Sequence, residues 1–268
     1  MKTPPTNPGT RRNLTLLVLL ITGATCAHAA PAKNAYFGEN TTPNVLTLLP
    51  MPPDVGSQEE AADRAGSLAV HTARTPEQVA LGKEQDKLTV FHFSRVLGSW
   101  FQKANLPKTD ALFAKLDREV IPLIENAKKY YQRPHPSQID SEHFKDVIAR
   151  DETGAYPSGH ATRATLYGII LVELIPNQRA ATMALGREMA WLRVTGGVAT
   201  LLDVFAGRVF GHALGQALMR NPEFLADFEE VREEITAAIA AASAPATQPA
   251  PATPPAPATP PVSAPEKK

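Results

Sequence analysis

The sequence predicts an all-α protein, a single-domain helical bundle spanning residues 57–240. Apolar residues recur three and four positions apart through this range, which is the spacing of one helix face. No stretch within it alternates strictly between apolar and polar residues, as a half-buried strand does. Capping residues and prolines bracket the periodic stretches. The range is long enough to enclose one sizeable hydrophobic core.

The first two expected helices begin at clear capping signals. Ser57 followed by Glu60 is a capping box, and it predicts an alanine-rich helix that reaches about residue 73. Thr75 followed by Pro76 is a second start, because proline is favoured at the first helical position. The apolar spacing after it predicts a helix that continues to about residue 103.

Six further helical segments are expected to complete the bundle. Thr109 is expected to cap a helix over 110–131, and Pro122 inside it should kink or break the pattern. A short helical piece is expected over 141–148 in an otherwise loop-rich stretch. The remaining helices are expected over residues 158–175, 177–195, 200–220 and 222–240.

The two ends of the chain are expected to lie outside this domain. Residues 1–29 combine a basic start, an apolar run and an Ala-x-Ala pattern, as a secretory signal peptide does. The apolar run is about half as long as a membrane span requires, so a membrane anchor is the less favoured alternative. Residues 30–56 are expected to form an extended segment. The expected location is therefore periplasmic or secreted, and no transmembrane span is expected after cleavage. The paired arginines at 11 and 12 leave both the Sec and the twin-arginine export routes open.

Composition narrows the functional classes. Residues 241–268 repeat the motif Ala-Pro-Ala-Thr-Pro-Pro, which predicts a disordered, extended tail without a core.

The single cysteine, Cys26, lies in the expected signal peptide, so the mature chain is expected to have no disulfide and no thiolate metal site. The 27 basic and 27 acidic residues balance, which argues against nucleic acid as the main partner. The sequence leaves the oligomeric state open.

The segment Pro-Ser-Gly-His at residues 157–160 carries the strongest chemical signal. It places a hydroxyl, free backbone amides and an imidazole at an expected helix start, which favours a bound anion. Lys128 and Arg133 precede it, and Arg193 and Asp203 follow it. These charges predict a phosphate site.

The order of these motifs resembles that of the bacterial class A non-specific acid phosphatases of the PAP2/vanadium-haloperoxidase superfamily. Their signature is K-x6-R-P, then P-S-G-H, then S-R-x5-H-x3-D. The resemblance covers roughly residues 36–228 and includes a leucine-proline segment at 48–53 and an Asn-Pro-x-Phe segment at 221–224. It implies the all-α fold of the PAP2 acid phosphatases, a phosphate or small phosphomonoester ligand, and no cofactor or metal.

Several positions match the residues of that signature. Lys128 falls on the lysine of the first motif, which binds phosphate. Ser158 and the amide of Gly159 fall on phosphate ligands, and His160 falls on the acid that protonates the leaving oxygen. Arg193 falls on the phosphate-binding arginine of the third motif.

Other positions depart from the signature. His135 replaces the arginine of the first motif and Arg133 lies two residues early, and both are candidate phosphate-binding residues. Leu192 replaces the serine of the third motif. The nucleophilic histidine falls on Ala199, although the aspartate that would orient it is present as Asp203. An alanine cannot form a phosphohistidine, and loss of a nucleophile typically costs on the order of 10⁴ to 10⁶ in turnover.

The resemblance therefore implies an exported acid phosphatase-like protein that binds phosphate with weak or no turnover. One alternative is an active, metal-independent acid phosphatase with a rearranged site, in which His160 would be the candidate nucleophile. Another is a non-catalytic envelope interaction protein. Each motif also has a structural explanation: Lys128 as solvated helix surface, and Asp203 as the partner of Arg193 or Arg208. His212 is best explained as a packing residue, because it falls on the helix face opposite Asp203.

Overall fold

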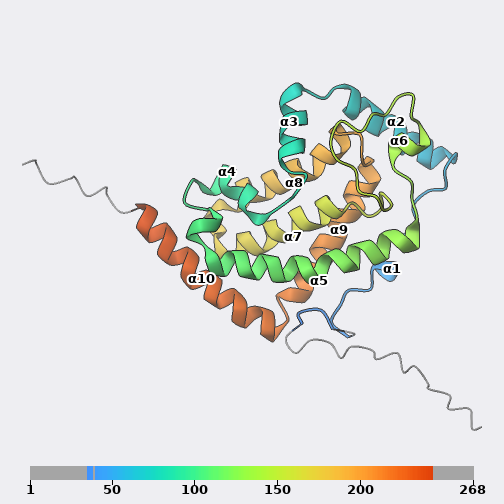
Figure 1. Ribbon diagram of the computed structural model, residues 1–268. Coiled ribbons are helices and arrows are strands. Elements are labelled where there is room, and N and C mark those ends of the chain that lie inside the picture. Colours follow the sequence, from blue (N-terminus) through green and yellow to red (C-terminus); the bar gives the residue numbers. More distant parts are fainter. Residues whose placement is uncertain (1–34, 39, 244–268) are drawn as a thin grey trace, which may run out of the picture. The chain divides into compact units, whose positions relative to one another are not determined.

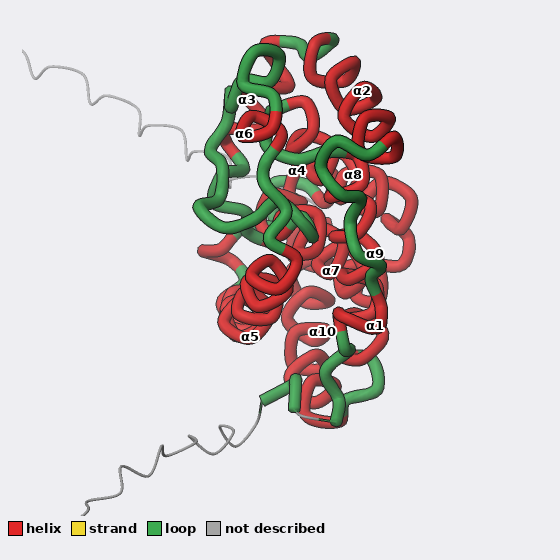
Figure 2. Tube along the Cα trace, turned by 90° about the vertical axis from the view of Figure 1, so that its right-hand side faces the viewer, coloured by secondary structure: helices red, strands yellow, loops and turns green. Residues whose placement is uncertain are grey.

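The computed structural model describes residues 35–38 and 40–243. All regular structure in this part of the chain is helical, which confirms the predicted all-α class (Figure 2). No helix within it is both long enough and apolar enough to span a bilayer. The predicted signal peptide and nearly all of the predicted tail lie outside the described residues.

Ten α-helices and three 3-10 helices follow one another along the described chain. Their bounds are α1 Val45–Leu48, α2 Gln58–Thr72, α3 Pro76–Glu84, η1 Val90–Phe93, α4 Ser94–Leu97, η2 Lys103–Asn105, α5 Pro107–Tyr131, α6 Pro136–Ile139, α7 Gly159–Leu174, η3 Pro176–Gln178, α8 Arg179–Thr195, α9 Leu201–Leu218 and α10 Pro222–Ser243.

Helix α7 is the centre of the bundle, packed along α8 and α9 and crossed by α5 (Figure 1). Its sequence is apolar nearly all round, which is the composition of a buried helix. Two glycines allow α9 to approach it closely. A Cβ at Gly207 would lie 2.4 Å from the Ser158 carbonyl oxygen, and one at Gly211 would lie 2.5 Å from that of Thr162. The first turn of α7 is thereby held against α9.

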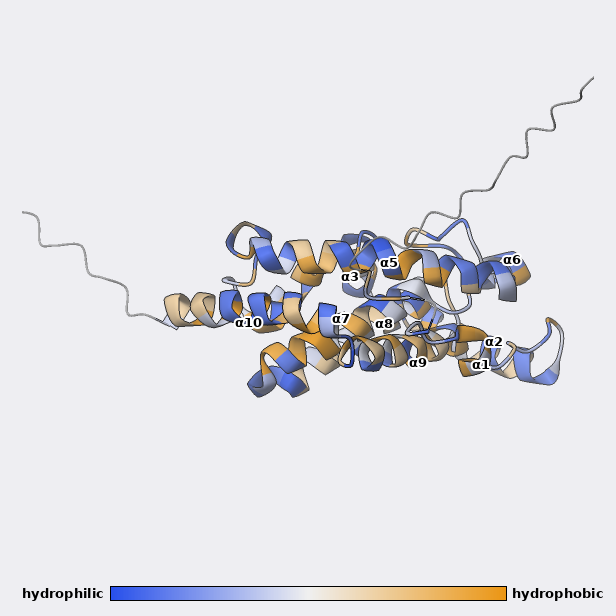
Figure 3. Cartoon of the chain, turned by 90° about the horizontal axis from the view of Figure 1, so that it is seen from below, coloured by the Kyte–Doolittle hydropathy of each residue, from blue (hydrophilic) through white to orange (hydrophobic). Residues whose placement is uncertain are grey.

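The amphipathic helix α5 closes the other side of the core. Its buried side chains recur at helical spacing, while polar residues cover its outer face (Figure 3). Helix α10 packs on α5. At the start of α5, Thr109 donates hydrogen bonds to the Glu234 carboxylate of α10 from its backbone N–H (2.8 Å) and its hydroxyl (2.7 Å). These bonds satisfy α5 backbone donors that have no partner within the helix.

Two predicted helix starts are confirmed and one predicted length is wrong. The Ser57 hydroxyl caps α2, and Thr75 forms a capping box with Gln78 at the start of α3. However, α3 ends at Glu84 and not near residue 103. At its C-cap, the Gln85 carbonyl accepts a hydrogen bond from the ring of His160. The chain then forms the short helices η1, α4 and η2 instead of continuing α3.

The prediction for α5 was wrong at its start, and of the kink or break expected at Pro122 the break does not occur. The helix begins at Pro107, and Thr109 is bonded to α10 instead of capping it. Pro122 does not break the helix, which continues to Tyr131. Pro122 is exposed, so water can satisfy the carbonyl that loses its helical partner.

The helical piece predicted over 141–148 is absent from the structure. The one-turn helix of this region is α6, which lies earlier in the chain. Phe144 and Ile148 are buried as the periodicity required, but the backbone between them bonds elsewhere. The Val147 N–H donates to the Gly196 carbonyl across the core, at 3.1 Å.

Candidate functional site

Ser158 and Gly159 begin helix α7 at the junction of α5 and α9. The Ser158 hydroxyl caps the helix by accepting from the Ala161 N–H at 3.4 Å, and its own N–H donates to the Asp203 carbonyl at 3.0 Å. A Cβ on Gly159 would lie 3.9 Å from the Nζ of Lys128. The free amides of a helix start and a lysine ammonium therefore lie side by side, an arrangement that favours an anion.

Lys128 is a buried cation, and not the solvated helix surface that was the alternative. Its side chain is 1% exposed. The Nζ lies 2.5 Å from a carboxylate oxygen of Asp151, 3.3 Å from the Thr153 hydroxyl and 3.6 Å from Glu125. A buried ammonium requires such partners to offset the loss of water.

Arg193 projects toward the same region from the end of α8. It is 5% exposed. Its Nη2 donates to the Ala149 carbonyl at 2.6 Å, and its Nη1 lies 3.5 Å from the Asp86 carboxylate. Within the described part of the chain, the buried Nη1 has no hydrogen-bond partner. Burial lowers the pKa of this guanidinium, and the nearby carboxylates of Asp151 and Asp86 partly oppose that effect.

His160 follows in the first turn of α7. Its Nε2 lies 3.1 Å from the Gln85 carbonyl, so this nitrogen carries the proton that is donated. Burial and the positive charge of Arg193 lower the pKa of His160 to about 3, against the opposing effect of Asp151. The ring is therefore neutral at ordinary pH in the protein without a bound anion.

Asp151 completes this cluster, and the sequence did not single it out. Burial would raise the pKa of its carboxyl, but Lys128, His160 and Arg193 together lower it to about 2. The carboxylate is thus charged throughout the usual pH range. No motif spacing marks the residue, because it reaches the cluster from the irregular loop between α6 and α7.

Asp203 and Arg133 form a separate buried pair. Asp203 has no exposed surface. One of its oxygens accepts from Arg133 Nη1 at 3.0 Å and the other from the Thr200 N–H at 2.7 Å. Arg133 Nη2 donates to Asp63 at 2.7 Å. Burial raises the pKa of Asp203, and Arg133 acts in the opposite direction. The partner of Asp203 is therefore Arg133, and not the Arg193 or Arg208 that the sequence suggested.

His135 is enclosed between two backbone carbonyls. Its Nδ1 lies 2.6 Å from the Val198 oxygen and its Nε2 lies 2.7 Å from the Thr153 oxygen. Both partners are backbone carbonyl oxygens, which only accept hydrogen bonds. The ring ties the loop before α7 to the segment that leads into α9.

Ala199, the position of the nucleophile in the resembling family, is 3% exposed. It belongs to a small apolar cluster with Ala161, Ala190, Val194 and Val204. Its N–H donates to the Arg193 carbonyl at 3.2 Å.

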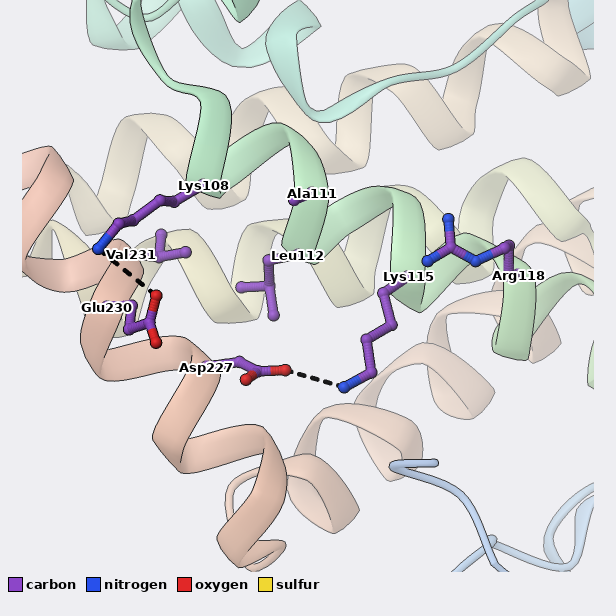
Figure 4. Close-up of a pocket in the computed structure, with 8 residues that line it drawn as sticks. All are labelled: Lys108, Ala111, Leu112, Lys115, Arg118, Asp227, Glu230 and Val231. Atoms are coloured by element: carbon purple, nitrogen blue, oxygen red, sulfur yellow. Dashed lines mark hydrogen bonds and ion pairs between the residues drawn. The ribbon is translucent and has the colours of Figure 1, made fainter. Parts of the chain in front are cut away.

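Hollows in the described structure include two that are lined by residues of α5. One of about 320 Å³ is lined by residues that include Lys128, Arg133 and Glu152. The other, of about 310 Å³, lies between α5 and α10 and is crossed by the ion pairs Lys108–Glu230 and Lys115–Asp227 (Figure 4). Among the described residues, no group of three or more His, Cys, Asp or Glu side chains is placed to hold a metal ion.

Comparison with known proteins identifies the family. Residues 112–226 match the model of the PAP2 superfamily. The chain is 27% identical to a non-specific acid phosphatase of Providencia stuartii over 208 residues, which cover 74% of this chain and 84% of the relative. It is 28% identical to an acid phosphatase of Zymomonas mobilis over 211 residues, 75% of this chain and 78% of the relative. A non-specific acid phosphatase of Salmonella typhimurium is 31% identical over 147 residues, 53% of this chain and 59% of the relative.

A solved structure of a transmembrane PAP2-type phosphatidylglycerolphosphate phosphatase from Bacillus subtilis is also similar, with a TM-score of 0.43 and 17% identity. The match covers 60% of this chain and 85% of that one. The sequence comparisons confirm the resemblance drawn from the motifs. The chain is similar to the PAP2 superfamily over residues 112–226 and is related to the bacterial non-specific acid phosphatases.

Proposed function

We propose that this protein binds phosphate or a small phosphomonoester in a pocket built from Lys128, Ser158, Gly159, His160 and Arg193. The buried Nη1 of Arg193 carries the proposal, because in the described structure it makes no hydrogen bond and only a long ion pair with Asp86 at 3.5 Å, so a ligand oxygen would satisfy it. Lys128 beside the first amides of α7 supports it, since both favour an anion. The acid phosphatase relatives supply the chemical class of the ligand.

We further propose that turnover is weak or absent. A nucleophile at residue 199 would have to attack phosphorus, and an alanine methyl group has no lone pair with which to do so. Asp203, which the resemblance assigns to orienting a histidine, has its carboxylate oxygens engaged by Arg133 and Thr200. In this proposal Asp203, Arg133 and His135 support the pocket and do not touch the ligand.

The proposed binding is tested by isothermal titration calorimetry with inorganic phosphate. Wild type is expected to bind at millimolar concentration or tighter, and Arg193→Ala is expected to lose at least about tenfold, since charge-assisted hydrogen bonds contribute about 1.5 to 3 kcal/mol. Arg187→Ala is the matched control, because Arg187 is an exposed arginine on the same helix. Absence of binding by wild type at acid and neutral pH would refute the pocket.

The proposed loss of the nucleophile is tested by hydrolysis of p-nitrophenyl phosphate. Wild type is expected to hydrolyse this substrate at a barely detectable rate. Ala199→His is expected to hydrolyse it faster and to form a phosphoenzyme that acid quenching can trap. Ala199→Gln controls for side-chain bulk, because filling this packed cluster is expected to cost about 1 to 3 kcal/mol of stability in either variant. Turnover by wild type that disappears in His160→Ala would instead favour an active enzyme with a rearranged site.

Export to the periplasm or beyond is a further part of the proposal. It rests on the signal-peptide pattern at residues 1–29, which lie outside the described residues. Mass spectrometry of the protein recovered from the producing cells is expected to show an N-terminus near residue 30. If the protein binds no phosphate and captures a partner protein only when residues 241–268 are present, the alternative function as an envelope interaction protein is favoured.

A further inference from the structure

We propose that Asp151 occupies the anion position of this site, so that its carboxylate competes directly with phosphate for the same cations. The inference rests on the pocket proposed above. In this inference, Asp151 sets the affinity of the pocket for phosphate. It also sets the smallest negative charge that a ligand needs in order to displace the carboxylate.

The ion pair between Lys128 and Asp151 carries this inference. The Nζ–Oδ2 distance is 2.5 Å, the shortest separation of the three oxygens around the lysine. This same Nζ lies beside Gly159 in the first turn of α7. The Lys128 ammonium, which would contact a bound phosphate, is therefore already paired with the Asp151 carboxylate. A phosphate oxygen can bind Lys128 at this position only if that carboxylate moves away.

The surroundings of Asp151 resemble those of a bound anion more than those of a surface ion pair. Lys128 comes from α5, His160 from α7 and Arg193 from α8, and all three act on the charge of this one carboxylate. Two cations and a neutral imidazole that converge from three helices form an arrangement suited to a phosphate group.

The Asp151 side chain is able to leave without releasing its loop. It is 39% exposed, whereas its partner Lys128 is 1% exposed. The loop has other attachments on the C-terminal side of Asp151: the Ala155 N–H donates to the Arg133 carbonyl at 2.9 Å, and the Thr153 carbonyl is bound by the His135 ring. Exchange of one side chain for a ligand is thus compatible with an unchanged backbone.

The test is a calorimetric titration of the full chain with inorganic phosphate, comparing wild type with Asp151→Asn and Asp151→Ala. Both variants are expected to bind phosphate about tenfold more tightly or better, because the ligand no longer displaces a charge-assisted hydrogen bond. Glu152→Gln is the matched control. It removes one negative charge from the adjacent exposed position, which lines the same hollow as Lys128, and it is expected to change the affinity much less.

The outcomes separate this inference from the proposed function. If wild type binds phosphate and both Asp151 variants bind it equally or more weakly, the inference is wrong and the pocket remains. An equal gain in Glu152→Gln would also contradict it, since general electrostatics would then explain the effect. If neither wild type nor the variants bind phosphate, the pocket and the inference both fail. Thermal melts followed by circular dichroism show whether each variant is folded. If Asp151→Asn does not fold, the affinity of Asp151→Ala decides the test.

Discussion

Single side chains in this protein have roles that depend on the partners they meet. Arg133 and Arg193 are both buried arginines, but only Arg193 has a buried nitrogen without a hydrogen-bond partner in the described structure. Arg133 is held between the carboxylates of Asp203 and Asp63. Arg133 is thus fully paired inside the fold, whereas Arg193 is the arginine that the proposed pocket would use.

His160 predicts how stability depends on pH. Its pKa is about 3 in the folded protein, against about 6.5 in an unfolded chain. Between these values the unfolded state binds a proton that the folded state does not, so stability falls as pH falls from about 6.5 to about 3. His71 and His212 also have pKa values lowered by burial, so they act in the same direction.

We therefore expect His160→Gln to lose less stability on acidification than wild type does. The measurement is the melting temperature of both proteins at several pH values between 7 and 4, in phosphate-free buffer. An identical slope in the two proteins would show that the ring of His160 is protonated in the fold as readily as in the unfolded chain.

At the scale of helices, capping signals could be predicted from the sequence because they are local. Ser57 and Thr75 cap their helices through bonds to residues three positions later. The early end of α3 and the missing helix over 141–148 could not be predicted, because the backbone there bonds to distant residues. The motif spacing placed Lys128, Ser158 and His160 near one another, whereas nothing in the spacing indicated Asp151 or the pairing of Arg133 with Asp203.

The contact between α7 and α9 gives a prediction at this scale. Gly207→Ala would place a methyl group 2.4 Å from the Ser158 carbonyl oxygen, so the helices must separate, at a cost of about 1 to 3 kcal/mol. Urea unfolding of the variant measures this loss. Gly168→Ala is the control, because its Cβ would meet only ordinary contacts at 3.6 Å and beyond; it is expected to be neutral or stabilising by up to about 1 kcal/mol. Equal effects of the two substitutions would contradict the close approach.

For the molecule as a whole, α10 joins segments that are far apart in the sequence. It packs along α5 through Phe224, Phe228, Val231 and Ile235, all of which are buried. Near its start, the Asn221 side chain donates to the Tyr36 carbonyl at 2.9 Å. The last helix therefore fastens the first described residues to the bundle.

Glu234→Ala tests this attachment. It leaves the two backbone donors and the hydroxyl at the start of α5 without their carboxylate partner, so we expect a loss of about 1 to 3 kcal/mol in urea unfolding. The neighbouring Glu233→Ala, at a position that is exposed, is expected to change stability by less than about 0.5 kcal/mol. A similar loss in both variants would indicate an effect on the helix itself.

The buried pair of Arg133 and Asp203 has a consequence for how such a chain can change over evolutionary time. Removing Asp203 would leave Arg133 with Asp63 as its remaining carboxylate partner and the Thr200 N–H without its acceptor, at a cost of about 1 to 3 kcal/mol. Selection for folding alone would therefore preserve Asp203, whether or not the site turns over a substrate. An aspartate at this position is thus a mark of a stable core and not, by itself, of catalysis.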